Sequence, residues 1–125
     1  MEYTLAGCRA REILDRVGDK WSLLVISLLG EGTKRFTELK REIDGISQRM
    51  LTVTLRALER DGIVTRTVYP VVPPRVDYSL TPMGATLMDA ANTLITWAES
   101  HLGEIDAARA DYDTRAGVQE PVKAL

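Results

Sequence analysis

The segment VYPVVPPRVDYSL, at residues 68–80, combines strand-forming residues with three prolines near its centre. A proline has no backbone N–H to donate, so these prolines belong at the tip of a β-hairpin and not inside a sheet. After them, apolar and polar residues alternate, which is typical of a strand with one buried face. The sequence therefore predicts a β-hairpin with strands over 63–69 and 76–80, joined by a stiff loop over 70–75 that carries Arg75.

The chain before this hairpin has the i, i+3, i+4, i+7 apolar spacing of amphipathic helices. Two helices are predicted before residue 30, with Asp19 as the N-cap of the second. A third, short helix is predicted around 36–43. Ser47 is the predicted cap of a fourth helix, QRMLTVTLRALERD, which ends at Gly62.

The fourth predicted helix has two different sides. At about 100° per residue, Leu51, Leu55 and Leu58 form a narrow apolar stripe. The opposite side has no acidic residue and begins near the helix N-terminus, where backbone N–H groups attract anions. Because a short turn containing glycine joins the third and fourth helices, the pair has helix-turn-helix spacing. Contact with a DNA groove is therefore favoured over a plain solvated face.

A helix-turn-helix followed by a two-stranded ribbon is a winged helix, so the predicted fold class is mainly α with a small β-hairpin (α+β). Thr81-Pro82 matches an N-cap followed by proline at the first helical position, which predicts the start of a last, long helix. We expect one domain over residues 1–125. Its predicted parts are N-terminal helices at 8–33, the helix-turn-helix at 34–62, the wing at 63–80, a dimerisation helix at 81–102 and a variable tail at 103–125.

The last predicted helix carries more apolar surface than one small domain can cover. We expect a second copy of the chain to cover the surplus, because twofold homodimers are the commonest assembly. The predicted interface residues are Leu87, Ala91, Leu94, Ile95, Ala98 and Leu102.

The start of the fourth helix would enter a major groove first. Gln48, Arg49 and Thr52 follow the N-cap Ser47 there, and they can read base edges because glutamine pairs well with adenine and arginine with guanine. For each assigned residue, plain solvated charge is the alternative. The predicted phosphate contacts are Lys34, Arg35, Arg56 and Arg60.

Arg75 has a separate predicted role on the wing. The prolines fix backbone angles, so this arginine would be presented without a large ordering cost on binding. It is predicted to enter a minor groove or to clamp a phosphate. An ion pair with Asp77 on the same ribbon is the alternative.

The distribution of charge supports a nucleic-acid partner more than the net charge does. The chain carries a formal charge of −2, but residues 34–75 hold nine Lys and Arg against five Asp and Glu, and both flanks are acidic. A basic middle between acidic ends is the pattern expected if the middle meets phosphate.

The sequence offers no residues for several other classes of function. No apolar run approaches the ~20 residues of a membrane span, and the N-terminus lacks the layout of a secretion signal, so we expect a cytoplasmic protein without membrane contact. One cysteine and one histidine, His101, form no metal set. Without a Gly-rich phosphate loop, G-x-S-x-G or H-E-x-x-H, we expect neither an enzyme nor a cofactor.

Three stretches together resemble the HxlR-type family of bacterial winged-helix transcription regulators: CRAREILDRVGDKWSLLVISLL (8–29), RFTELKREIDGISQRMLTVTLRALERDGIV (35–64) and RTVYPVVPPRVDYSLTPMG (66–84). The resemblance spans roughly 8–102, and the wing is its most distinctive part. It implies a homodimer built from the first and last helices, with two recognition helices in successive major grooves of a double-stranded operator. It also implies control of a nearby gene, commonly by repression.

The resemblance extends to Cys8, which falls where the family carries a cysteine that senses electrophiles or oxidants in several members. Arg9 and Arg11 stand nearby, and such neighbours lower a thiol pKa and raise the thiolate fraction. The alternative is a small, half-buried apolar residue packed at a dimer edge. With no second cysteine in the chain, a disulfide would have to join two subunits or capture a small thiol.

Two other hypotheses remain open from the sequence. A winged helix can be a protein-interaction module whose basic face docks an acidic surface without binding DNA. A small-molecule effector held between the long helix and the DNA-binding unit is compatible with the regulator hypothesis.

Overall fold

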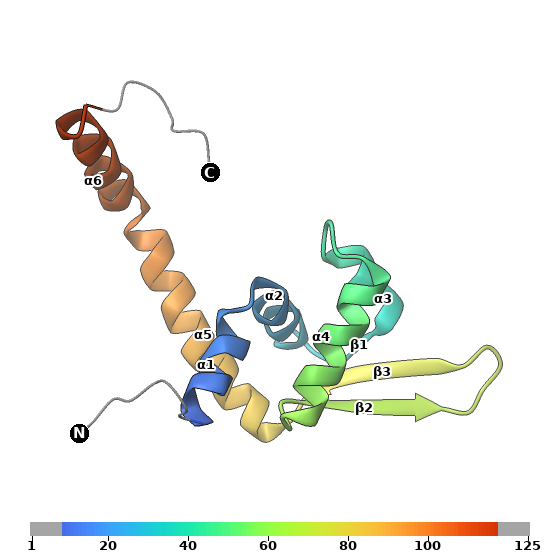
Figure 1. Ribbon diagram of the computed structural model, residues 1–125. Coiled ribbons are helices and arrows are strands. Elements are labelled where there is room, and N and C mark those ends of the chain that lie inside the picture. Colours follow the sequence, from blue (N-terminus) through green and yellow to red (C-terminus); the bar gives the residue numbers. More distant parts are fainter. Residues whose placement is uncertain (1–8, 118–125) are drawn as a thin grey trace. The chain divides into compact units, whose positions relative to one another are not determined.

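The computed structural model describes residues 9–117 (Figure 1). Its contacts divide the chain into two units, one ending at Asn92 and the other beginning at Thr93. The elements in chain order are α1 (Arg9–Gly18), α2 (Lys20–Leu29), β1 (Lys34–Arg35), α3 (Phe36–Glu42), α4 (Gln48–Arg60), β2 (Val64–Tyr69), β3 (Arg75–Leu80), α5 (Pro82–Ser100) and α6 (Leu102–Arg115).

The sheet has three antiparallel strands in the order β1-β3-β2. The predicted hairpin is present as β2 and β3, but the sequence analysis expected no third strand. β1 has only two residues, too few to show an alternating pattern in the sequence. It is a strand because Lys34 and Arg35 pair with Tyr78 and Asp77 of β3. Arg75 was predicted in the loop, yet it is the first residue of β3 and pairs with Tyr69. The prediction was wrong on this point because hairpin pairing continues further toward the tip than the alternating pattern indicated.

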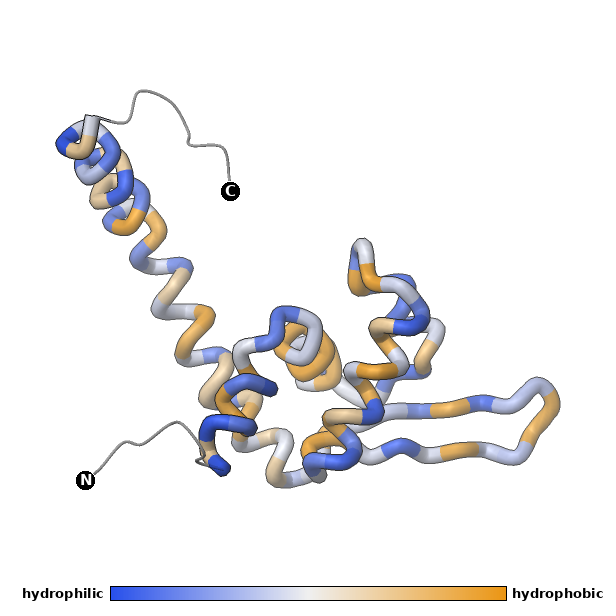
Figure 2. Tube along the Cα trace, in the orientation of Figure 1, coloured by the Kyte–Doolittle hydropathy of each residue, from blue (hydrophilic) through white to orange (hydrophobic). Residues whose placement is uncertain are grey.

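The core of the first unit lies between α2, α3, α4 and the base of the hairpin. α2 is the most continuously hydrophobic helix (Figure 2) and buries Val25 and Ile26 completely. α4 buries Leu51, Leu55 and Leu58, as its predicted apolar stripe requires. Truncating one such leucine to alanine costs about 2–5 kcal/mol, so this stripe fixes which side of α4 faces outward.

Side-chain caps fix the starts of two helices where the sequence predicted them. Asp19 accepts hydrogen bonds from the Trp21 backbone N–H, with N to Oδ1 at 3.3 Å, and from the Ser22 hydroxyl. The Ser47 hydroxyl accepts one from the Met50 N–H at 3.0 Å. These bonds satisfy amide groups that the first turn of a helix leaves unpaired, which confirms the start of α2 and of α4.

Thr81 joins the start of α5 to the end of α4. Its hydroxyl accepts a hydrogen bond from the Gly84 N–H at 2.9 Å and donates one to the Gly62 carbonyl at 2.6 Å. Its own N–H donates to the Ile63 carbonyl at 3.0 Å. A Cβ at Gly84 would collide with that same carbonyl oxygen, so only glycine allows this close approach.

α1 lies at the surface of the first unit and contributes no buried residue to its core. None of its residues is buried, and Ile13 and Leu14 are exposed. The Arg16 guanidinium Nε lies 2.7 Å from Asp61 Oδ2, just after the end of α4. The apolar face predicted for α1 therefore finds no full cover within the described residues.

The second unit contains the end of α5 and α6, which meet at His101. The sequence analysis ended its long helix at residue 102, whereas the structure has a break at His101 and a further helix to Arg115. The His101 ring stacks on Trp97 with centroids 4.5 Å apart. Among the described residues, no helix is both long and apolar enough to cross a membrane.

Candidate nucleic-acid interface

The turn between α3 and α4 determines which side of α4 is outward. Ile43 and Ile46 are both buried and anchor the two ends of this turn. Gly45 between them has φ of +86°, a left-handed conformation that glycine adopts without strain. With both ends anchored and the leucines of α4 in the core, the remaining side of α4 faces outward.

The outward side of α4 carries unpaired positive charge. Arg49, Arg56 and Arg60 are exposed, and none of them forms an ion pair with another residue in 9–117. The first turn of α4 has no acidic residue, but Glu59 further along is exposed and lines a depression with Thr52 and Arg56, so the prediction of an acid-free side is wrong at that position. This surface therefore combines free guanidinium groups with the positive end of the helix dipole, which together attract an anion.

The predicted base-reading residues lie at the start of the same surface. Gln48 and Arg49 are exposed in the first turn, and Thr52 is half-buried one turn further on. The hydroxyl of Ser47 is already used as the cap of α4. The Ser47 O–H group can still donate a hydrogen bond, so the cap does not prevent Ser47 from contacting DNA.

Lys34, predicted to hold phosphate, is instead enclosed by carboxylates. Its Nζ lies 3.1 Å from Glu42 Oε1 and 3.4 Å from Glu31 Oε1, and its side chain is only 15% exposed. The hydrogen bond with Glu42 raises the pKa of Lys34. The geometry therefore argues against the predicted phosphate contact, because the ammonium is already neutralised locally.

Arg75 adopts the arrangement that the sequence analysis kept as its alternative. Its Nε and Nη2 donate to the two carboxylate oxygens of Asp77, each at 3.0 Å, and its guanidinium lies over the ring of Tyr69 at 5.0 Å. Asp77 is buried, and the hydrogen bonds from Arg75 hold its pKa below the usual range. The bidentate pair occupies the fork that a phosphate would otherwise use.

The strand register places Arg75 and Arg66 on opposite faces of the sheet. Residues paired directly across two strands point to the same face. Arg75 pairs with Tyr69, whereas Arg66 pairs with Tyr78, whose side chain is in the core beneath α4. Arg66, and not Arg75, therefore lies on the side of the hairpin that faces α4.

Arg66 is a candidate contact that the sequence analysis missed. It lines a surface depression of about 300 Å³ together with Thr52, Arg56 and Glu59 of α4 and Tyr78 of β3. The sequence analysis included Arg66 only in the charge count. Residues 63–69 alternate poorly between apolar and polar, so the sequence does not show which face of the strand Arg66 lies on. Only the pairing with β3 supplies that information.

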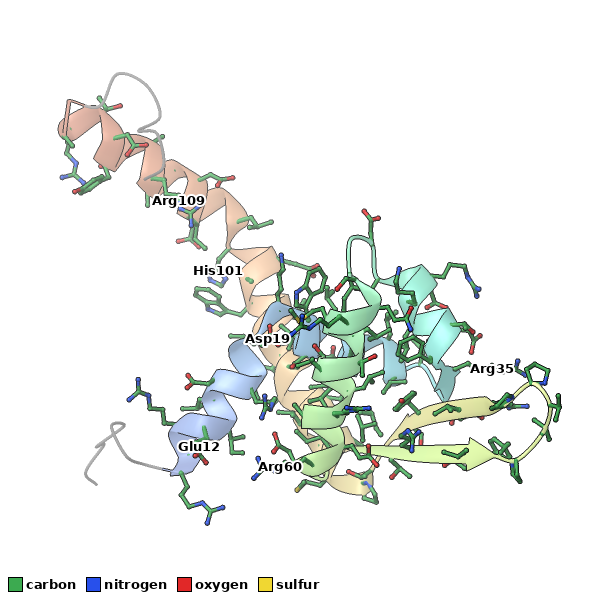
Figure 3. All side chains as sticks on the ribbon, turned by 45° about the vertical axis from the view of Figure 1, so that its right-hand side comes forward. Glu12, Asp19, Arg35, Arg60, His101 and Arg109 are labelled. Atoms are coloured by element: carbon green, nitrogen blue, oxygen red, sulfur yellow. The ribbon has the colours of Figure 1, made fainter. Side chains whose placement is uncertain are left out.

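Arg35 lies at a second depression, on the other side of the hairpin. This depression, of about 530 Å³, lies between the start of α3 and the wing loop. Arg35 is exposed, and its backbone N–H donates to Glu38 Oε1 at 2.8 Å. Figure 3 shows Arg35 near the start of α3 and Arg60 where α4 ends. Val72, at the tip of the loop, is 98% exposed.

The model of the HxlR-like helix-turn-helix family matches residues 16–106. The chain belongs to this family. It is therefore a helix-turn-helix transcriptional regulator and not an enzyme. Family membership confirms the resemblance that the sequence showed.

Curated and solved HxlR-type relatives agree with this assignment. The uncharacterized HTH-type transcriptional regulator YtfH of Escherichia coli (strain K12) is 46% identical over 102 residues, covering 82% of this chain and 81% of that protein. The solved ytfH structure from Salmonella typhimurium has a TM-score of 0.77 at 44% identity, covering 82% of this chain and 92% of the other. The redox regulator HypR in its reduced form has a TM-score of 0.74 at 42% identity, covering 80% of this chain and 99% of HypR. These likenesses confirm the winged-helix fold class.

The residues predicted for a dimer interface of this HxlR-family chain differ in how much of their surface is open. Ala91 is only 2% exposed, and Leu87 packs against the core of the first unit. Leu94 and Leu102 are exposed, at 57% and 55%. Ile95 and Ala98 are half-buried. Of the predicted interface residues, those with most exposed surface therefore lie after Asn92.

Two further points concern Cys8 and metal binding. Cys8 lies outside the described residues, so its surroundings stay a prediction. Within 9–117, no group of three or more His, Cys, Asp or Glu side chains could hold a metal ion.

Proposed function

We propose that this HxlR-family regulator is a cytoplasmic homodimeric repressor that binds a double-stranded DNA operator. The observation that carries the proposal is the outward side of α4, with three exposed arginines that have no carboxylate partner in the described residues. Glu59 is the only acidic residue of α4, so the three arginines leave this side of the helix with a net positive charge. A face of unpaired arginines on a helix-turn-helix is suited to the phosphates and base edges of a major groove.

Base readout is assigned to the first turns of α4. Gln48 and Arg49 are exposed there, with Thr52 one turn further along. Each well-aligned bidentate contact to a base contributes about 1–3 kcal/mol of discrimination. Phosphate contacts are assigned to Arg35, Arg56 and Arg60, while Lys34 and Arg75 remain engaged with carboxylates.

Dimerisation is supported by the exposed apolar side chains of α1, α5 and α6. Ile13, Leu14, Leu94, Trp97 and Leu102 are all exposed in a single chain. A twofold dimer would present two copies of α4 to one duplex, with half-sites about 34–36 Å apart or a multiple of that distance.

The proposal is tested by operator selection followed by quantitative binding. Sites are recovered from fragmented source DNA, and affinity is then measured for the selected operator and for a random duplex. Arg49→Ala should reduce the ratio of these affinities by about 30-fold or more, because one bidentate base contact of at least about 1 kcal/mol is lost from each protomer of the dimer. Arg109→Ala is the matched control, since Arg109 is an exposed arginine of α6 far along the sequence from α4. An unchanged ratio for Arg49→Ala would remove Arg49 from readout.

Binding to a random duplex is enough to distinguish the regulator hypothesis from the protein-interaction module. The regulator predicts weak binding at low salt that is lost as salt rises, because phosphate contacts release counterions. The module predicts no binding at any salt concentration.

Release from DNA is assigned to an oxidant or electrophile that modifies Cys8, with a small-molecule effector as the alternative. The likeness to HypR, a redox regulator, supports an oxidant effector. Oxidant should lower the operator affinity of the parent protein and leave that of Cys8→Ser unchanged. Equal loss of affinity in both proteins would exclude the thiol as the sensor and favour the alternative effector.

A further inference from the structure

The depression between α4 and the hairpin is a small site with charged walls. Thr52, Arg56 and Glu59 from α4 form one wall, and Arg66 and Tyr78 from the hairpin form the other. We call it the α4–hairpin notch. Its volume of about 300 Å³ lies at the lower end for ligand sites and leaves room for a phosphate-sized group.

Both walls of the notch stand on fixed elements. α4 packs against β2, and Arg66 is paired in register with Tyr78, which is buried (Figure 1). Thr52 lies one residue after Leu51, which is fully buried in the core. The two arginines are thus carried by a helix and a strand that cannot move apart without disturbing the core.

The two arginines of the notch have no ion-pair partner among the described residues, as is true of most arginines and lysines there. Arg16, Lys34, Arg75 and Arg115 each lie within ion-pair distance of a carboxylate. Arg56 and Arg66 form no such pair in 9–117, although Glu59 shares the notch and stands one helical turn after Arg56. Two guanidinium groups and one carboxylate leave the notch with a net positive charge.

The chemistry of the notch fits a phosphodiester. A guanidinium presents parallel N–H donors that match two oxygens of a phosphate, and two guanidiniums can grip the same group from different sides. Thr52 and Tyr78 carry hydroxyl groups that can donate further hydrogen bonds. A DNA strand that flanks the groove entered by α4 would pass over the mouth of the notch, where one of its phosphates could enter.

We infer that Arg56 and Arg66 jointly hold one backbone phosphate of the bound DNA in the α4–hairpin notch. Glu59 opposes this phosphate and limits the affinity of the site. The inference rests on the proposed DNA binding. It adds Arg66, on the side of the hairpin that faces α4, to the residues that contact phosphate.

The test is the salt dependence of binding to a random duplex, measured by fluorescence anisotropy for the parent, Arg56→Gln, Arg66→Gln and the double variant. One arginine can still neutralise a shared phosphate, so each single variant should change the slope of log affinity against log salt only slightly. The double variant should reduce the slope by about 1.8 per dimer, from one phosphate per protomer at about 0.9 each. Between 50 and 200 mM salt, its loss of affinity would be about 12-fold smaller than that of the parent.

Other patterns of slope contradict a shared phosphate. Additive losses of about 0.9 per protomer from each single variant would mean two separate phosphates. A double variant identical to Arg56→Gln would mean that Arg66 contacts no DNA. Either result overturns the inference while leaving the proposed function intact. Failure of the parent to bind duplex at low salt would overturn both.

Two further variants make the test sharper. Glu59→Gln should raise the affinity of the parent several-fold and have a smaller effect in the double variant, where no phosphate is held next to residue 59. An equal effect in both backgrounds would contradict the assigned role of Glu59. Arg109→Gln, on α6, is the matched control and should leave the slope unchanged. Far-UV circular dichroism checks folding. In the Arg56→Gln background, Arg66→Lys keeps the positive charge and should preserve the parent slope, whereas Arg66→Gln should reduce it.

Discussion

The Arg16 guanidinium lies 2.7 Å from the Asp61 carboxylate, and this ion pair connects α1 to the residue that follows α4. α1 buries none of its residues, and this pair adds a polar contact to those that α1 makes with α2. Removing one partner should lower the free energy of unfolding by about 0.5–1 kcal/mol, since both side chains keep some contact with water. Chemical denaturation of Arg16→Ala, Asp61→Ala and the double variant measures the coupling. Equal losses in the double variant and in either single variant would support the pair, and simple additivity would contradict it.

Asp77 should make stability depend on acid pH. Its pKa is lowered in the folded protein, mainly by hydrogen bonds from Arg75, relative to about 3.9 in an unfolded chain. The unfolded state therefore takes up the proton first on acidification. The stabilising contribution is present above about pH 4 and is lost as pH falls through the folded pKa. The difference in thermal midpoint between the parent and Asp77→Asn should shrink below pH 4, and a difference that stays constant to pH 2 would contradict this.

Gly84 should tolerate no side chain. A Cβ there would overlap the Ile63 carbonyl oxygen, so Gly84→Ala has to displace the start of α5 and should cost about 1–3 kcal/mol or more. Gly103→Ala is the matched control, because Gly103 is also helical but has open space around it. That variant should be neutral or stabilising by up to about 1 kcal/mol. Thermal unfolding of both variants measures the difference in stability. Equal stability of the two variants would contradict the need for a close approach at Gly84.

Charge placed on the open apolar surface of α5 should separate the proposed dimer. Leu94→Glu puts a carboxylate where burial against a second copy is proposed, and its desolvation would oppose association. Light scattering after size exclusion should show a monomer for this variant. Val72→Glu is the control, because Val72 is equally apolar and even more exposed but lies on the wing. Dimers of both variants would exclude Leu94 from the interface.

The residues that the sequence predicted well are those whose role depends on near neighbours in the chain. Asp19 and Ser47 cap helices through hydrogen bonds to amides two or three residues away. The leucine stripe of α4 repeats every three or four residues, so its buried side could be recognised directly.

The features that the sequence analysis did not foresee depend on partners distant in sequence. Lys34 is enclosed because Glu42, eight residues later, folds back to it through α3. The face on which Arg66 lies is set by its pairing with Tyr78, and no local alternation in β2 reveals it. β1 has no pattern of its own and forms only because β3 is there to pair with it.

The Thr81 junction has a mechanical consequence. One side chain bonds the carbonyl that follows α4 and the amide of the first turn of α5, while Gly84 lies against the next carbonyl of the chain. The end of α4 and the start of α5 are therefore held together as one rigid unit. Any rotation of the first turn of α5 has to turn the end of α4 with it or break these bonds.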